Sequence, residues 1–132
     1  MTSVKFIEQV IRRGRVSRRK RQFEYETYDG RHKVKGLVAD VFGIRDTGAG
    51  YAVTHLPTGL NVATCHKMFE SEGDALRFIY AIRKIYRWNT KKLVAIKRNE
   101  TIVFSLRDYC RGKTIADSTL QLLKERLDAS SS

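Results

Sequence analysis

Arginine is concentrated in one short segment of the chain, residues 12–21. Seven of these ten residues are Arg or Lys and none is acidic. Such a run repels itself unless it is solvated or bound to an anion. Arginine outnumbers lysine by six to one, and its planar guanidinium suits bidentate contacts with phosphates or base edges. The segment therefore predicts a nucleic-acid contact. Its predicted residues are Arg12, Arg13, Arg15, Arg18, Arg19, Lys20 and Arg21.

The positive charge of the chain lies in two blocks. The net charge is +12 over 132 residues; residues 1–35 carry +7, residues 36–76 carry −3, residues 77–98 carry +8, and residues 99–132 are neutral. Two basic blocks around a slightly acidic centre could form one phosphate-binding surface if the fold brings them together. The second block and the hairpin before it add further predicted contacts. These are Arg31, Lys33, Lys35, Arg83, Lys84, Arg87, Lys91 and Lys92.

Aromatic residues near these cations suggest base stacking. Single-stranded nucleic acids are bound by cations that follow the backbone and by aromatic faces that stack on bases. Tyr28 lies between acidic and basic hairpin positions, and Trp88 lies between Arg87 and Lys91. We expect these two aromatics to be exposed and to stack on bases, while Phe23 and Tyr25 belong to the core.

The residue types needed for catalysis are sparse and scattered. Cys65 and His66 are adjacent, so in a strand their side chains point to opposite faces. Asp40 and Asp46 could hold a metal in a nuclease, but no paired-acid motif with a nearby lysine accompanies them. The two cysteines have no metal-binding spacing. The sequence predicts no catalytic residues, no metal and no cofactor, with Cys65 as a core thiol.

The hairpin around Asp29-Gly30 is the clearest local element. This dipeptide predicts a type I′ turn, and pairing outward from it places Glu26 opposite Lys33 and Glu24 opposite Lys35. The resulting pattern has a period of two residues, as a half-buried strand requires. Glu24, Glu26, Tyr28, Arg31, Lys33 and Lys35 share one face; Phe23, Tyr25, Thr27, His32 and Val34 share the other.

The second strand of this hairpin should continue, and two further strands and a helix should follow it. We expect one long strand through residues 36–45, a turn at residues 46–50, and a hairpin of residues 51–56 and 60–65 with His55 opposite Asn61. Residues 69–88 then carry apolar residues at helical spacing, with Ser71 as N-cap and Asp74 three residues later.

The two ends of the chain add helices. Residues 3–13 predict a helix with Ser3 as N-cap and Gly14 as its stop. Residues 91–98 and 101–109 are rich in β-branched residues and predict two strands, with a helix as the alternative for either. A last helix should run from Thr114 or Asp117 to about residue 129.

The predicted fold class is α+β: an antiparallel four-stranded meander followed by a helix (ββββα), with an N-terminal helix and a C-terminal ββα extension. Residues 1–21 form a helix and basic arm, residues 22–129 a single domain, and residues 130–132 a disordered tail. The element order over about residues 22–88 resembles that of the whirly and PUR-repeat group of single-stranded-DNA-binding proteins. The same order occurs in unrelated α+β domains, so the resemblance implies fold more than function.

These features predict a non-catalytic protein that binds DNA or RNA, with single strands slightly favoured. The alternative is a protein-interaction module that docks on an acidic protein or a nucleoprotein complex, and a nuclease is a third, weaker reading. The printed sequence has no apolar segment of the length that a signal peptide or a membrane span needs. We therefore expect no signal peptide, no membrane association, and a cytoplasmic or nucleoid location, or a nuclear one in a eukaryote. A homo-oligomer is compatible with all of these.

Overall fold

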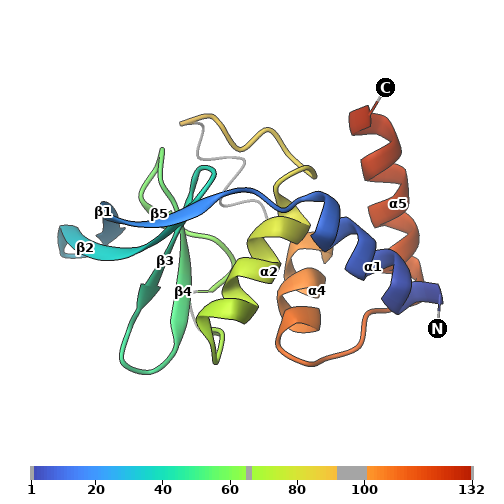
Figure 1. Ribbon diagram of the computed structural model, residues 1–132, viewed down its shortest axis with the longest axis horizontal. Helices are drawn as coiled ribbons and strands as arrows, with labels where there is room; N and C mark the ends of the chain where they lie inside the picture. The colour runs from blue at the N-terminus through green and yellow to red at the C-terminus, as the bar shows by residue number, and fades with distance from the viewer. Residues whose placement is uncertain (1, 65–66, 92–100, 132) are drawn as a thin grey trace.

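The computed structural model describes residues 2–64, 67–91 and 101–131. An antiparallel sheet forms one side of the molecule and helices form the other (Figure 1). The five strands are neighbours in chain order: β1 (Arg18–Thr27), β2 (Gly30–Ala39), β3 (Phe42–Asp46), β4 (Tyr51–His55) and β5 (Leu60–Asn61). The helices of the described residues are α1 (Thr2–Arg13), α2 (Glu72–Ile82), α4 (Thr101–Cys110) and α5 (Asp117–Ser131). The α+β class is confirmed.

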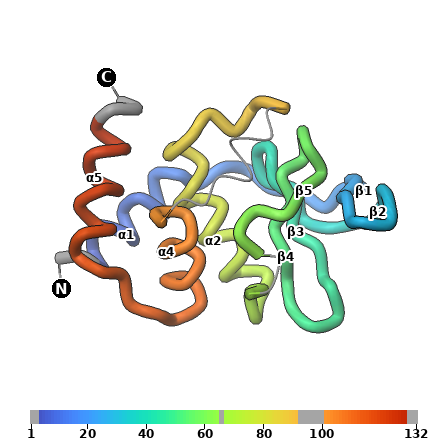
Figure 2. The backbone as a smooth tube through the Cα atoms, turned by 180° about the vertical axis from the view of Figure 1, so that it is seen from behind, coloured from blue at the N-terminus to red at the C-terminus, as the bar shows by residue number. Residues whose placement is uncertain are grey.

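Helix α2 lies between the sheet and the other helices, as both backbone views show (Figure 2). It packs against β3 and β4 on one side and against α1 and α4 on the other. Its residues Phe78, Ile79 and Ile82 are fully buried, because apolar side chains surround most of the helix. The core is therefore continuous from the sheet through α2 to α4.

The β1–β2 hairpin keeps its predicted faces but not its predicted register. Glu26 pairs with Arg31, Glu24 pairs with Lys33, and Thr27 pairs with Gly30. The register differs from the prediction by two residues, and a shift of two leaves every side chain on its expected face. The turn residues are Tyr28 and Asp29. Asp29 does not adopt positive φ, so the predicted type I′ turn at Asp29-Gly30 was wrong.

The strand predicted through residues 36–45 is two strands. The chain reverses at Asp40 and Val41, and Ala39 pairs with Phe42 across this tight turn. Asp40 adopts a left-handed conformation with φ 56°, which Asp tolerates better than most residues. The sequence pattern did not place the turn, because apolar residues lie on both sides of Asp40 and the segment reads as one long strand.

The last hairpin of the sheet is shorter than predicted, and its register is shifted by one residue. His55 pairs with Leu60 and Thr54 pairs with Asn61, whereas His55 was expected opposite Asn61. The β4–β5 turn also touches the first hairpin, since the Glu26 N–H donates to the Gly59 carbonyl at 2.7 Å. The sheet therefore curls until its first strand meets its last turn. The turn predicted at residues 46–50 is confirmed.

Helix α2 begins as predicted and ends early. The Ser71 side chain accepts a hydrogen bond from the Asp74 N–H at 3.1 Å, which confirms the N-cap. The helix stops at Ile82 rather than continuing to residue 88. The chain turns back there, and the Trp88 Nε1–H donates to the Ile82 carbonyl at 2.8 Å. The same carbonyl, at the end of the helix, also accepts from the Ile85 N–H at 3.0 Å.

The strand predicted at residues 101–109 was wrong, because this segment is helix α4. Ile102, Val103, Leu106 and Cys110 are buried at helical spacing and pack toward α2. Packing thus overrides the strand preference of the β-branched residues. Of the other predicted strand, residues 92–98 lie outside the described residues. Helix α5 starts at Asp117 as expected but continues to Ser131, so the predicted tail is helical up to that residue.

Helix α1 begins at Thr2, so Ser3 is a helical residue rather than the N-cap. Ile7 and Ile11 are buried, while Val4 is 44 % exposed. The helix ends at Arg13, directly before Gly14, but Gly14 does not adopt the left-handed conformation of a helix stop. A Cβ at Gly14 would lie 2.9 Å from the Tyr80 carbonyl carbon and closer still to its oxygen. Gly14 is needed because the chain passes so close to α2.

Candidate nucleic-acid interface

The basic segment spans three elements: the end of α1, a linker of residues 14–17, and the start of β1. The predicted basic arm is thus partly sheet, because Arg18, Arg19, Lys20 and Arg21 are strand residues paired with β2. The linker is held against α2. Besides the close approach of Gly14, the Tyr80 hydroxyl donates to the Val16 carbonyl at 3.3 Å. The arginines therefore project from a backbone with a defined position.

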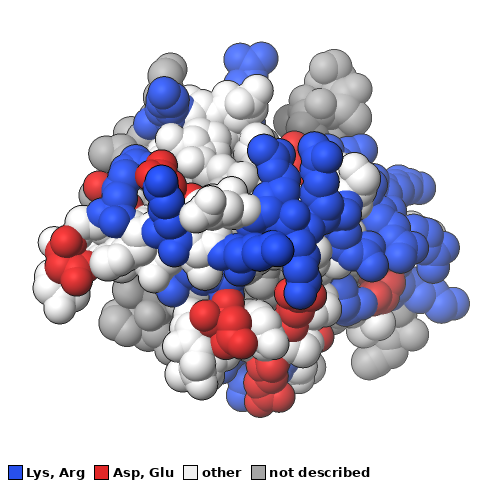
Figure 3. All heavy atoms as spheres, turned by 60° about the vertical axis from the view of Figure 1, so that its left-hand side comes forward, with Lys and Arg blue, Asp and Glu red and all other residues white. Residues whose placement is uncertain are grey.

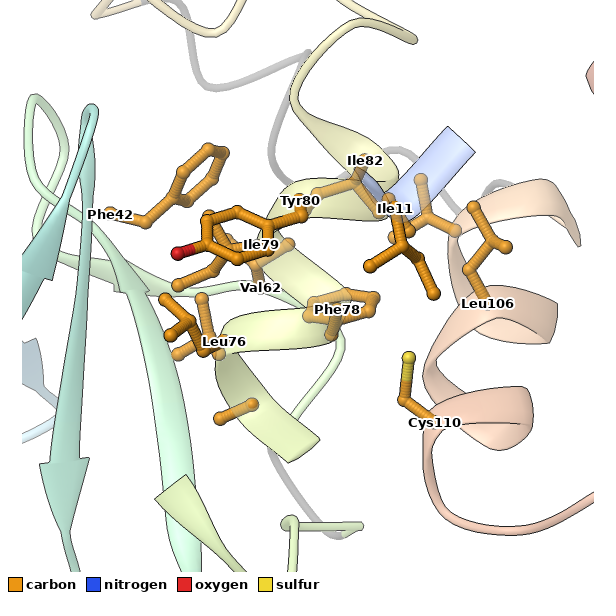
Figure 4. Packing of buried hydrophobic residues seen from close by; sticks show 14 of the residues in the cluster. Ile11, Phe42, Val62, Leu76, Phe78, Ile79, Tyr80, Ile82, Leu106 and Cys110 are labelled. Atoms are coloured by element: carbon orange, nitrogen blue, oxygen red, sulfur yellow. The ribbon is translucent and has the colours of Figure 1, made fainter. Parts of the chain in front are cut away.

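The first of two adjoining hollows, here named the helix pocket, lies between α1, the linker and α2 and has a volume of about 300 Å³. Its lining combines apolar residues with charged groups. The apolar residues Ile11, Leu76 and Tyr80 belong to the hydrophobic core, as the close view shows (Figure 4). The polar and charged lining comprises Glu8, Arg12, Arg15, Arg18 and Arg77, with Gly73 of the first turn of α2 beside them.

The second hollow, here named the strand pocket, lies between the start of β1 and the β2–β3 turn and has a volume of about 430 Å³. Arg18 lines both pockets, so they form one surface. Asp40 at its edge accepts from the Arg83 Nε–H at 3.2 Å, and this ion pair brings one residue of the second basic block to the first. The lining is Ser17, Arg18, Arg19, Arg21, Val38 and Asp40.

Both acidic groups of these pockets have a cationic partner within the chain. Glu8 accepts two hydrogen bonds from Arg77, each 2.8 Å long, and a third from the Tyr109 hydroxyl at 2.5 Å. The Arg77 hydrogen bonds hold the pKa of the Glu8 carboxyl below its usual value and raise the pKa of Arg77, and burial raises the pKa of Tyr109 to about 12. The carboxylates therefore leave most of the arginine charge uncompensated.

Lys and Arg side chains merge into a broad continuous surface on one face of the molecule (Figure 3). All seven Arg and Lys residues of the segment 12–21 are exposed. Among the described residues, five pocket arginines have no carboxylate within ion-pair distance. These are Arg12, Arg15, Arg18, Arg19 and Arg21. An unpaired cluster of this kind is electrostatically unfavourable until an anion binds it.

The charged hairpin face is more nearly balanced than the pockets. Arg31 lies 3.8 Å from Glu24 and 3.7 Å from Glu26, and Lys33 pairs across the ladder with Glu24. Lys35 is exposed opposite Gln22. Tyr28 at the hairpin tip is fully exposed (104 %), which confirms that expectation.

Trp88 is buried, and the expectation that it is exposed for stacking was wrong. Only 4 % of it is accessible, and its ring lies 5.3 Å from that of Phe42. Its carbonyl contacts His55 Nε2 at 2.5 Å, and His55 Nδ1 lies 2.9 Å from the Thr58 hydroxyl. Because a carbonyl can only accept, Nε2 carries the proton and Nδ1 accepts from Thr58. His55 thus fixes the segment after α2 to the sheet, and burial lowers its pKa.

The other described residues predicted from the second basic block do not line the pockets. Lys84, Arg87 and Lys91 are exposed in the segment after α2 and line neither pocket. Lys92 and Cys65 lie outside the described residues. Three residues that shape the surface had escaped prediction as site residues: Glu8, Asp40 and Arg77. Their partners are far away in the sequence, so no local pattern could have identified them.

Little else in the described residues suggests chemistry. No group of three His, Cys, Asp or Glu side chains there could hold a metal ion. Cys110 is buried, which raises the pKa of its thiol to about 12. In the described ranges, no helix has the length and apolar character needed to cross a membrane. Comparisons of the chain with protein-family models, curated proteins and solved structures found no match.

Proposed function

We propose that the protein binds nucleic acid without catalysing a reaction, and that the helix pocket and the strand pocket hold its phosphates. One observation carries the proposal: the two pockets share Arg18, and arginines line them both while their acids are paired within the chain. Guanidinium groups contact phosphates with two parallel hydrogen bonds, and a concave surface with one sign of charge concentrates a polyanion.

The number of arginines sets the expected dependence on salt. If Arg12, Arg15, Arg18, Arg19 and Arg21 each neutralise one phosphate of a duplex, log K should fall against log salt with a slope of about −4.5. Affinity should then decrease by about 500-fold between 50 and 200 mM salt. Phosphate contacts carry no sequence information, so little preference among sequences is expected.

The test is a binding titration of labelled DNA and RNA, as duplexes and single strands, across a salt series. In the pocket variant Arg18→Ala/Arg19→Ala/Arg21→Ala, the slope should become less negative by about 2.7 and binding should weaken for every sequence. These side chains are exposed, so the fold should tolerate the change.

A matched control removes the same charge elsewhere. Lys5, Lys67 and Lys113 are exposed and line neither pocket, so their triple replacement by Ala should leave the slope nearly unchanged. Equal losses in both variants would mean that net charge, rather than the pockets, attracts the polymer. Absence of binding to all four polymers near physiological salt would refute the proposal and favour a protein-interaction module. Metal-dependent cleavage in the same mixtures would show a nuclease.

A further inference from the structure

We infer that the form of nucleic acid bound is the duplex, held by its phosphates with no base stacked on the protein. This inference rests on the proposed function and specifies its substrate class. It departs from the preference for single strands that the aromatic residues had suggested.

Every Phe, Tyr and Trp of the chain lies within the described residues, so the aromatic surface is fully accounted for. Tyr28 is the only exposed one. Single-strand binding without sequence preference uses aromatic faces on which successive bases stack. One exposed ring cannot form such a track.

Four of the six partly exposed rings are covered by cations of the chain itself; the other two are Tyr51 and Tyr109. The Arg45 guanidinium lies 4.0 Å from the centre of the Tyr25 ring, and His32 stacks on the same tyrosine at 5.3 Å. Similar cation contacts, at 4.9–5.1 Å, cover Phe6, Tyr86 and Phe104. A base would have to displace these cations before it could stack there.

Tyr28 is also remote from the pockets along the chain. It follows the far end of β1, whereas Arg18 begins that strand. Ten strand residues separate the ends by about 30 Å of contour. No arginine of either pocket is therefore adjacent to Tyr28 in the hairpin, where the nearest cation, Arg31, is already close to Glu24 and Glu26.

The arginines of the pockets favour the form of nucleic acid with the higher charge density. A duplex carries one charge per about 1.7 Å of axis and releases more counterions per contact than a single strand does. With five arginine contacts, the slopes of the two forms, about 0.9 against 0.7 per contact, differ by about 1.0. If both forms bind equally at about 1 M salt, this difference gives a preference for the duplex of about five- to tenfold near 0.15 M salt.

The experiment compares anisotropy titrations of duplex DNA, duplex RNA and the corresponding single strands of equal length, using the full chain and its Tyr28→Ala variant. We expect both duplexes to bind about five- to tenfold more tightly than single strands. Tyr28→Ala should change no affinity by more than about twofold, whereas loss of a stacked base would cost roughly 5- to 150-fold. The DNA and RNA arms show which duplex is preferred.

Two results would overturn the inference and leave the proposed function standing: single strands bound as tightly as duplexes, or a loss above about fivefold for Tyr28→Ala on any polymer. Failure of the wild-type chain to bind any of the four polymers would instead refute the proposed function itself. The two failures are therefore distinct. Because Tyr28 is fully exposed at a turn, its variant should fold normally.

Discussion

Replacing Gly14 by Ala tests the contact that holds the arginine-bearing linker against α2. The added methyl group would lie 2.9 Å from the carbonyl carbon of Tyr80 and 3.2 Å from its Cα. Ordinary contacts begin at 3.4 Å, and both partners are backbone atoms. Neither can yield by rotating a side chain, so the linker and α2 must move apart.

The cost should be that of overpacking a tightly packed site. Inserting a methyl group into such a site costs about 1–3 kcal/mol, and the rigid backbone on both sides places Gly14→Ala near the upper end, at about 2–3 kcal/mol. The displacement would also weaken the hydrogen bond from the Tyr80 hydroxyl to Val16. For a chain of this size, the loss corresponds to a decrease in Tm of about 10 °C.

Gly73→Ala is the matched control, since Gly73 lies in α2 on the side of the helix pocket. A Cβ there would meet only the Ser71 hydroxyl, at 3.8 Å. Alanine is the better helix former, so this variant should be unchanged or more stable by up to about 1 kcal/mol. The measurement is urea unfolding and thermal melting, followed by circular dichroism, on the wild-type chain and both variants.

A Gly14→Ala protein as stable as the wild type would refute this reasoning. It would mean that α1 and its linker do not approach α2 as closely as described. Equal destabilisation by Gly73→Ala would also contradict it, because the effect would then not depend on the contact with Tyr80. A lower Tm for Gly14→Ala alone is the expected result.

Two further predictions concern acid and the strand pocket. The folded chain lowers the pKa of His55 and of Glu8, so as the pH falls the unfolded chain takes up protons at these residues first. The free energy of unfolding should therefore decrease below about pH 6.5 because of His55, and decrease further below about pH 4.5 because of Glu8. Urea midpoints at several pH values check this: a Glu8→Gln variant should lose less of its stability below pH 4.5, and a flat profile from pH 7 to 3.5 would contradict it. Asp40→Asn should strengthen nucleic-acid binding, because it removes the acidic group of the strand pocket and frees Arg83; titration at fixed salt tests it, and unchanged or weaker binding would mean that phosphates do not enter that pocket.

Several features of the fold were readable from local sequence because their causes are local. The two faces of the first hairpin follow from a period of two residues, and they survived an error of two residues in register. Ser71 was recognisable as an N-cap because its partner, the Asp74 N–H, is three residues away. The extreme charge of residues 12–21 is likewise a property of composition alone.

Long-range contacts decided the remainder. Trp88 stands among polar and basic residues in the sequence, yet its ring is buried against Phe42. His55, 33 residues earlier, binds its carbonyl. The segment 101–110 has strand-like residues but buries them as a helix against α2. Such choices depend on surfaces that exist only after collapse, and no local propensity encodes them.

The candidate site divides in the same way. Composition by itself determined that the chain carries an arginine-rich segment suited to a polyanion. Only the tertiary structure decided that α1, the linker and β1 shape that segment into two pockets joined at Arg18, with Glu8 and Asp40 neutralised by Arg77 and Arg83. The physical reason is distance: charge is a sum over residues, whereas a pocket and its ion pairs require residues separated by 43 and 69 positions to meet.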